Sequence, residues 1–380
     1  MLSGLHARRQ TPEYRSMILQ GQSTGLELAC ISKMRSAIFW NSRRGVIRIQ
    51  VININRYREI IERFSQLRVL VIGDLMVDKY IWGSGIRLSS EAAVPVIKVS
   101  REEYSLGGAA NIAFHLSNMG AIIHLCGLAG YDDAAHHLRY RVSQNGMNAG
   151  GIFPSSDRPT TQKIRIMSTE HNQILGRFDY EQSNPMSKEE LAMVTQFIRT
   201  YADEVDLLIL SDHGRGMFQT EEFNRFLLDV TSRGRIAVYA QSRSSCPSCL
   251  NWVDCFSIST RLASKLVLSE SSQINPEPGQ IARAFHSQFG IQSLLLYNGA
   301  DRFISFFSGG EESFRYDEFS DQILDQTGIG DLVLSVFAAS RTCGAAIDES
   351  IILAFKSMIL KGKQVGTGRV TRDELLQIVS

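Results

Sequence analysis

The segment RVLVIGD, residues 68–74, is a short apolar run that ends in an aspartate. The segment VDLLILSD at 205–212 has the same form, and similar runs recur along the chain with stretches of helical periodicity between them. A strand that is apolar throughout is buried on both faces, which is typical of a parallel sheet covered by helices on both sides. The sequence therefore predicts an α/β fold, a three-layer α/β/α domain whose central sheet is mainly parallel.

Predicted strands and helices alternate from residue 55 onward. Two of the helices open with capping boxes, formed by Ser187 with Glu190 and by Thr371 with Glu374. We expect strands at 68–74, 121–127, 205–212, 235–240 and 291–299, and helices at 55–65, 109–120, 132–146, 187–201, 220–234, 279–290, 328–341, 348–362 and 371–379.

Two segments, 79–104 and 159–181, break this alternation. Both show the period of two that is typical of strands, with Gly, Pro and Ser at the turns. They predict a small antiparallel β sheet inserted at the carboxyl ends of the early strands, where open α/β sheets bind their ligands. Such a sheet could act as a lid over the site.

The composition narrows the class of partner. The 380 residues carry 40 Lys and Arg against 39 Asp and Glu, a net charge of +1, so no overall field attracts nucleic acid or an anionic membrane. The apolar runs are far shorter than the ~18 residues that a membrane helix needs, which favours a soluble protein. Six sparse cysteines suit a reducing compartment, hence a cytoplasmic location, and we interpret CPSC at 246–249 as structural.

Residues 1–52 differ in character from the rest of the chain. They are basic and lack a sustained period of either a helix or a strand. We interpret them as a disordered N-terminal extension or as sequence upstream of the true start site. A transit peptide fits less well, because the segment contains acidic residues and shows no clear amphipathic face.

A first glycine cluster lies in LGGAANIAFHL, residues 106–116, where a loop leads into a predicted helix. Gly107 and Gly108 allow the backbone to approach a ligand closely, and Asn111 adds a neutral donor and acceptor. The same residues are compatible with a helix start packed through small side chains. The segment matches neither the dinucleotide fingerprint nor the P-loop, so a nicotinamide-dependent dehydrogenase is not supported.

A second cluster lies in DQTGIGDLVLSVFAA, residues 325–339. Gly328, Ile329 and Gly330 would present successive N–H groups at a helix N-terminus, which is a ready anion site. Asp331 lies within one turn of these groups and could accept the proton of a substrate hydroxyl while they neutralise a transferring phosphoryl group. The alternative is an acidic residue in an ordinary helix cap.

Acidic residues also follow the predicted strands. Asp74 ends the first strand, Asp78 follows one turn later, and Asp212 ends another strand. Polar side chains at the carboxyl ends of parallel strands commonly contact a ligand, although an acid at such a position can also cap the next helix.

The order of these elements resembles the ribokinase-like (PfkB) carbohydrate kinase family, and within it the heptose 7-phosphate kinase domain of ADP-heptose synthesis. The resemblance covers roughly residues 55–370, so we expect a kinase domain over 53–380. It rests on the segments VIGDLMVDKYIWG, RLSSEAAVPV, LGGAANIAFHLSNMGA, CGLAGYDDA, TTQKIRI, RFDYE, LSDHGRG and DQTGIGD.

The resemblance implies a role for each candidate residue. Asp331 would be the catalytic base, and the N–H groups of Gly328, Ile329 and Gly330 would form the anion hole. The sugar would be held by Asp78, Gly107, Gly108 and Asn111, and a sugar phosphate would be met by Arg87, Lys163 and Arg165, unless these three are surface charges. ATP with Mg²⁺ would lie along 297–300 and 354–367, which include Asn298, Gly299 and Gly366. A homodimer would form through the lid.

The sequence departs from the family on the nucleotide side. Ile329 is bulkier than the usual alanine, Gln241 stands where relatives usually carry an acid, and 257–265 lacks the usual acidic pattern. Phe355 and Lys356 stand where relatives show Asn and small residues. The leading hypothesis is an ATP-dependent kinase acting on a hydroxyl of a sugar or sugar phosphate, such as the anomeric hydroxyl of a heptose 7-phosphate. The alternative is a kinase-fold sugar-binding protein with weak or lost phosphotransferase activity.

Overall fold

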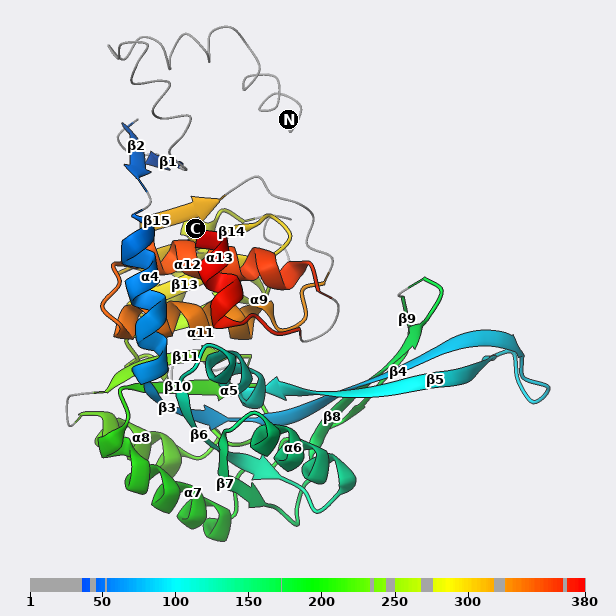
Figure 1. The fold of residues 1–380 in the computed structure, drawn as a ribbon. Helices are drawn as coiled ribbons and strands as arrows, with labels where there is room; N and C mark the ends of the chain where they lie inside the picture. The colour runs from blue at the N-terminus through cyan, green and yellow to red at the C-terminus, as the bar shows by residue number, and fades with distance from the viewer. Residues whose placement is uncertain are drawn as a thin grey trace, which may run out of the picture. The chain divides into compact units, whose positions relative to one another are not determined.

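The computed structural model describes residues 36–41, 46–51, 53–171, 173–232, 236–243, 250–267, 276–317, 325–364 and 368–379 (Figure 1). The chain forms two compact units, residues 1–54 and 55–380. In the first, β1 (Ser36–Asn41) and β2 (Val46–Val51) pair as an antiparallel hairpin. The CPSC motif lies outside the described residues, and the division into an extension and a kinase domain stays a prediction.

A nine-stranded sheet, counted over the described residues, runs through the second unit in the order β15-β14-β13-β12-β11-β10-β3-β6-β7. Its seven strands from β13 to β7 are mutually parallel, and β14 and β15 form an antiparallel hairpin at one edge. The bounds are β3 (Arg68–Gly73), β6 (Ile122–Ala129), β7 (Asn148–Pro154), β10 (Leu207–Asp212), β11 (Ala237–Ser242), β12 (Cys255–Ser259), β13 (Ser293–Asn298), β14 (Phe303–Ser308) and β15 (Glu311–Asp317).

Helices cover both faces of this sheet (Figure 1). Leu70 and Leu208 face a core shared with α7, α8, α9 and α10, whereas α5, α11 and α12 pack on the opposite face. The central strands β3 and β10 are apolar over most of their length because alternate side chains enter different cores. The helices are α4 (Ile54–Arg63), α5 (Ala109–Asn118), α6 (Asp133–Gln144), α7 (Lys188–Tyr201), α8 (Glu221–Ser232), α9 (Thr260–Val267), α10 (Pro278–Phe289), α11 (Ile329–Thr342), α12 (Ile347–Gly362) and α13 (Arg372–Val379), with short 3₁₀ turns at Phe64–Gln66 and Ala202–Glu204.

The predicted α/β/α fold is confirmed, and so are both capping boxes. Ser187 and Glu190 exchange side-chain and backbone hydrogen bonds at the start of α7. Thr371 and Glu374 do the same before α13. None of the described helices is both long and apolar enough to cross a bilayer.

A second, four-stranded sheet, in the order β5-β4-β8-β9, lies where the sequence predicts the small sheet, and we refer to it as the lid, a role that stays a prediction. Its strands are β4 (Leu75–Leu88), β5 (Pro95–Gly108), β8 (Thr161–Ser168) and β9 (Ile174–Tyr180). Its two outer pairs are antiparallel as predicted, and its central pair, β4 with β8, is parallel. One residue, Asp74, separates β3 from β4, and β5 runs directly into α5, so the lid grows from the carboxyl end of the central sheet and extends away from it (Figure 1).

Candidate active site

Asp331 lies in the first turn of α11 and is only 5% exposed. Its Oδ1 accepts a hydrogen bond of 2.7 Å from Nε2 of Gln241, at the end of β11. Its Oδ2 accepts a hydrogen bond of 2.7 Å from Nδ2 of Asn111, in the first turn of α5. The structure therefore brings together three segments that are far apart in sequence, and two amides fix both oxygens of one buried carboxylate.

Burial raises the pKa of Asp331 above its ordinary value, because the charged form loses solvation. The positive charge of Arg243 and the two amide donors act in the opposite direction, and the negative charge of Asp78 adds to the rise. A carboxylate with a raised pKa is a stronger proton acceptor, which suits a general base.

The glycine motif before Asp331 forms the start of α11. Gly328 is the N-cap and has a φ of 75°, in the left-handed region that favours glycine. A Cβ at Gly330 would lie 2.0 Å from the Tyr297 hydroxyl oxygen, so no side chain fits there. The first N–H groups of a helix have no acceptor within the helix and can bind an anion. Of the three predicted donors, the Ile329 N–H already donates to the Gln326 carbonyl oxygen at 3.3 Å.

Ile329 does not narrow this turn. Its side chain is 1% exposed, and its Cδ1 would lie 3.5 Å from a Cβ built on Gly299. The added bulk relative to alanine therefore fills space in the protein interior. Gly299 is close to Gln326 as well, which places the 297–300 segment beside the start of α11.

On the acceptor side, Asp78 of β4 forms an ion pair with Arg165 of β8. A Cβ on Gly107 would lie 2.7 Å from Oδ2 of Asp78, and a Cβ on Gly108, whose φ is 58°, would lie 2.3 Å from the Asp74 carbonyl oxygen. Gly108 is therefore required by close backbone packing, whereas a side chain at Gly107 would press on the Asp78 carboxylate. Asn111 is fully buried, and its Oδ1 has no hydrogen-bond partner among the described residues, so one acceptor beside Asp331 is available to a ligand.

Several cations gather near these carboxylates. Lys163 lies opposite Asp78 in the β4–β8 pair. Burial lowers its pKa, and the nearby charges of Arg243, Arg177 and Arg215 lower it further. The sequence analysis did not identify Arg215 and Arg243, although both follow strand ends and could have been found by the rule that pointed to Asp212.

Arg87 is not brought to this group. It is exposed and pairs with Val96 near the distal end of the lid. It lies nine positions beyond Asp78 on β4, which at the usual strand rise corresponds to roughly 30 Å.

The predicted nucleotide residues are only partly free for binding. The Oδ1 of Asn298 accepts hydrogen bonds from the backbone N–H groups of Ala300 and Asp301, so this side chain closes its own turn. Phe355 is fully buried and packs edge-to-face on Tyr316, with ring centroids 4.8 Å apart. Gly366 lies outside the described residues.

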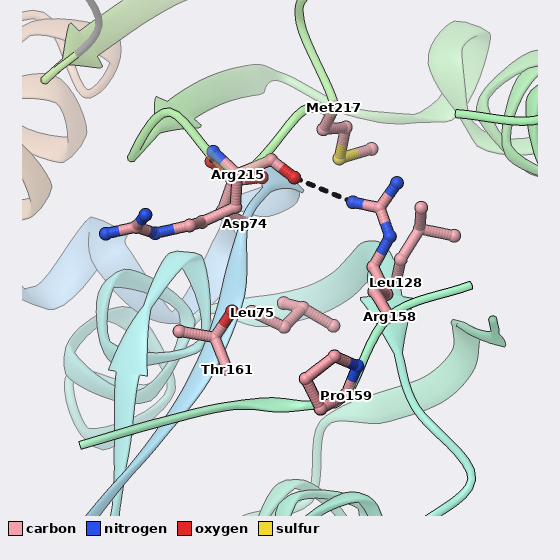
Figure 2. Close-up of a pocket in the computed structure, with 8 residues that line it drawn as sticks. All are labelled: Asp74, Leu75, Leu128, Arg158, Pro159, Thr161, Arg215 and Met217. Atoms are coloured by element: carbon pink, nitrogen blue, oxygen red, sulfur yellow. Dashed lines mark hydrogen bonds between the residues drawn. The ribbon is translucent and has the colours of Figure 1, made fainter. Parts of the chain in front are cut away.

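A small pocket opens at the base of the lid, lined by residues of β4, β6 and β8, by Asp74 and by the segments that precede β8 and follow β10 (Figure 2). Arg158 donates a hydrogen bond of 2.7 Å to the Arg215 carbonyl oxygen across it. Oδ2 of Asp74 accepts hydrogen bonds from the N–H groups of His213 and Arg215. The pocket is lined by Asp74, Leu75, Leu128, Arg158, Pro159, Thr161, Arg215 and Met217. Asp74 thus fixes the turn that carries Arg215 toward the site.

This architecture, with a glycine turn and a buried acid at a helix start, is that of a ribokinase-like protein. Ribokinase from Arabidopsis thaliana, solved with ribose and ATP, matches with a TM-score of 0.62 at 16% identity, over 83% of this chain and 99% of that one. Phosphofructokinase-2 from Escherichia coli, solved with potassium, matches with a TM-score of 0.64 at 12% identity, over 82% and 98%. At these identities the likeness shows the fold. Residues 66–373 match the pfkB family of carbohydrate kinases, and the chain belongs to that family.

The curated relatives include two proteins named bifunctional protein HldE. The one from Desulfatibacillum aliphaticivorans is 29% identical over 315 residues, which are 82% of this chain. The one from Syntrophotalea carbinolica is 30% identical over 324 residues, 83% of this chain. The chain spans 63% of the length of each of these relatives.

Proposed function

We propose that the protein is an ATP-dependent carbohydrate kinase in which Asp331 is the catalytic base. The observation that carries the proposal is the position of Asp331, buried in the first turn of α11 with both carboxylate oxygens held by amides. The family membership and the ribokinase-like fold support it. An acceptor hydroxyl that enters between Asp78 and Asn111 would give its proton to Asp331 as it attacks the phosphoryl group.

The residues around Asp331 would divide the remaining work. Oδ1 of Asn111 can accept a hydrogen bond from a sugar hydroxyl and so orient the acceptor. The first N–H groups of α11 would stabilise the charge that develops on the phosphoryl oxygens. When bound, Mg²⁺-ATP supplies the phosphoryl group, and the metal neutralises its charge.

We assign no protein ligand to Mg²⁺. Within the described parts of the chain, no three His, Cys, Asp or Glu side chains are grouped so that they could hold a metal ion. Part of the reason is that Gln241 and the segment 257–265 supply no acidic side chain. Beside β11, the strand β12 contributes Ser257 and Ser259 instead. The same observation favours the second candidate function, a kinase-fold sugar-binding protein with weak or lost transfer activity.

For the acceptor we propose a sugar phosphate, and specifically a heptose 7-phosphate phosphorylated at its anomeric hydroxyl. Lys163 interacts electrostatically with Asp78, and Arg243 interacts with both Lys163 and Asp331, so positive charge lies near the carboxylates of the site, which a neutral sugar would not require. Arg215 also lies near Lys163, but its guanidinium is paired with Glu181. The similarity to the HldE proteins supports the choice of a heptose.

We further propose that the lid carries a homodimer contact. It exposes several large apolar side chains in addition to its buried ones, and an exposed apolar patch is typical of a protein interface. These side chains are Leu88, Val94, Val99, Ile174, Leu175, Phe178 and Tyr180. Light scattering of the purified chain would measure the mass.

The test is ADP release from Mg-ATP across a panel of sugars and sugar phosphates, with Asp331→Asn as the variant. We expect turnover with a sugar phosphate. In the variant we expect a loss of kcat by several orders of magnitude with sugar binding nearly unchanged, because the proton acceptor is lost while Asp78 and Asn111 remain. Thermal stabilisation by the sugar without any effect of nucleotide, and without ADP release, would instead identify a binding protein.

A further inference from the structure

Gln241 lies at the point where the central sheet meets the candidate base. It is the fifth residue of β11, is 6% exposed, and is paired in register with Ser211 of β10 and Ser257 of β12. Its Nε2 donates to Oδ1 of Asp331 at 2.7 Å and to Oγ of Ser211 at 3.1 Å. Both amide hydrogens are therefore used inside the protein.

The chemistry of the two partners fixes the orientation of this amide. An ionised carboxylate only accepts hydrogen bonds, so the NH₂ group must face Asp331. Ser211 anchors the opposite side of the same NH₂ group, and its Oγ lies 3.2 Å from Nε2 of the buried His213. His213, Ser211 and Gln241 thus form a series of contacts that leads from β10 to Asp331, and each contact restricts the orientation of the next side chain.

We propose that Gln241 is a positioning residue of the kinase reaction, and that its side-chain amide holds the Asp331 carboxylate in one orientation through the anchor at Ser211. This inference rests on the proposed function, because it assigns Gln241 to the base of that reaction. The sequence comparison alone suggested a loss on the nucleotide side, whereas the contacts place Gln241 on the acceptor side. It acts through Asp331 and contacts neither substrate.

Other groups also face Asp331, and a test must separate their effects from that of Gln241. Asn111 on α5 donates to the other oxygen. Arg243 after β11 and Asp78 on β4 act through charge, and Tyr297 on β13 interacts electrostatically with the same carboxylate. Substitutions at 241 replace none of these four residues, and Gln241→Met adds no charge, so a shift in the titration of Asp331 in that variant can be attributed to loss of the amide.

The decisive variants are Gln241→Glu and Gln241→Met. In Gln241→Glu a carboxyl group of nearly the same shape replaces the amide donor, so two carboxyl groups lie in contact and their titrations are coupled. The acid limb of the kcat/KM–pH profile should therefore move up by about one pH unit or more. In Gln241→Met the donor is lost without a new charge, and we expect kcat to fall about tenfold with a smaller upward shift and little change in sugar KM. Gln196→Glu on the exposed face of α7 is the matched control.

Folding is checked by thermal denaturation of each variant, and Ser211→Ala provides a second route to the same effect. Loss of the Ser211 hydroxyl should reduce kcat, as Gln241→Met does, but by less. The hydrogen bond from Gln241 to Asp331 remains in this variant. A Gln241→Glu profile that superimposes on the wild type, with both variants folded, would overturn the inference. Absence of ADP release by the wild-type chain would instead remove the proposed function, and the two failures are therefore distinct.

Discussion

Substitution of Asp74 by asparagine should stabilise the protein at neutral pH. Burial is the main cause that raises the pKa of Asp74 from its ordinary 3.8 to about 6, and repulsion by Asp212 adds to it, while the N–H groups of His213 and Arg215 oppose the rise. A raised pKa means that folding favours the protonated acid, so stability falls as pH rises from about 4 to about 6. Two units at about 1.4 kcal/mol each amount to about 3 kcal/mol lost above pH 6.

Asparagine keeps the acceptor that the backbone needs. Its Oδ1 can take the hydrogen bonds that now reach Oδ2 of Asp74 at 2.7 and 3.0 Å, and its NH₂ group can turn toward Asp212. Urea denaturation between pH 4 and 8 should therefore show Asp74→Asn to be more stable than the wild type by up to about 3 kcal/mol at pH 7 and equal to it near pH 4. Asp203→Asn, at an exposed position, is the control. Parallel pH profiles of wild type and Asp74→Asn would refute the reasoning.

Two further substitutions test the lid and the fold separately. Gly107→Ala places a Cβ 2.7 Å from Oδ2 of Asp78 and so displaces that carboxylate. The KM for the sugar, measured by ADP release, should rise at least tenfold with a smaller effect on kcat. An unchanged KM would argue against Asp78 as a sugar ligand. Ser187→Ala removes the N-cap of α7 and should lower the free energy of unfolding in urea by about 1 kcal/mol. Turnover should not change, because α7 lies on the face of the sheet away from Asp331. A change in KM would show that α7 and the site are coupled.

Most of the central fold could be predicted because burial on two faces leaves a local signature. The runs at 69–72 and 207–210 are apolar at every position, and they lie within β3 and β10. The sequence analysis missed β12 and α9, because Ser257, Ser259 and the charged residues after them obscure the pattern. It also missed β7 at one edge of the sheet and the antiparallel β14–β15 hairpin at the other edge. The parallel pairing of β4 with β8 depends on the path of the chain and has no local signature.

The site shows the same limit more sharply. The glycine motif and Asp331 could be identified locally, since a helix start needs its own residues close together. The contact between Asn111 and Asp331 joins residues 220 positions apart, and that between Gln241 and Asp331 joins residues 90 positions apart. Such contacts follow from strand order and register, which a single sequence does not specify. Arg87 was expected near the site because it lies in the lid segment, but its place far along β4 from Asp78 keeps it away from Asp331.

Uncharged polar side chains at the ends of parallel strands can reach the site as well as the acids that the sequence singles out. In a parallel sheet every strand delivers its last side chains to the same edge, whatever their charge. Asp212 and Gln241 end neighbouring strands, and one of them anchors a turn while the other contacts the base. An amide at such a position can do what an acid cannot, because it donates a hydrogen bond to a carboxylate instead of repelling it. Relative to the acid that the family resemblance implies at this position, Gln241 lacks a charge and donates a hydrogen bond to Asp331. Under the proposed function, measurements of metal dependence and of the Asp331 titration should therefore respond to substitution of Gln241 in different ways.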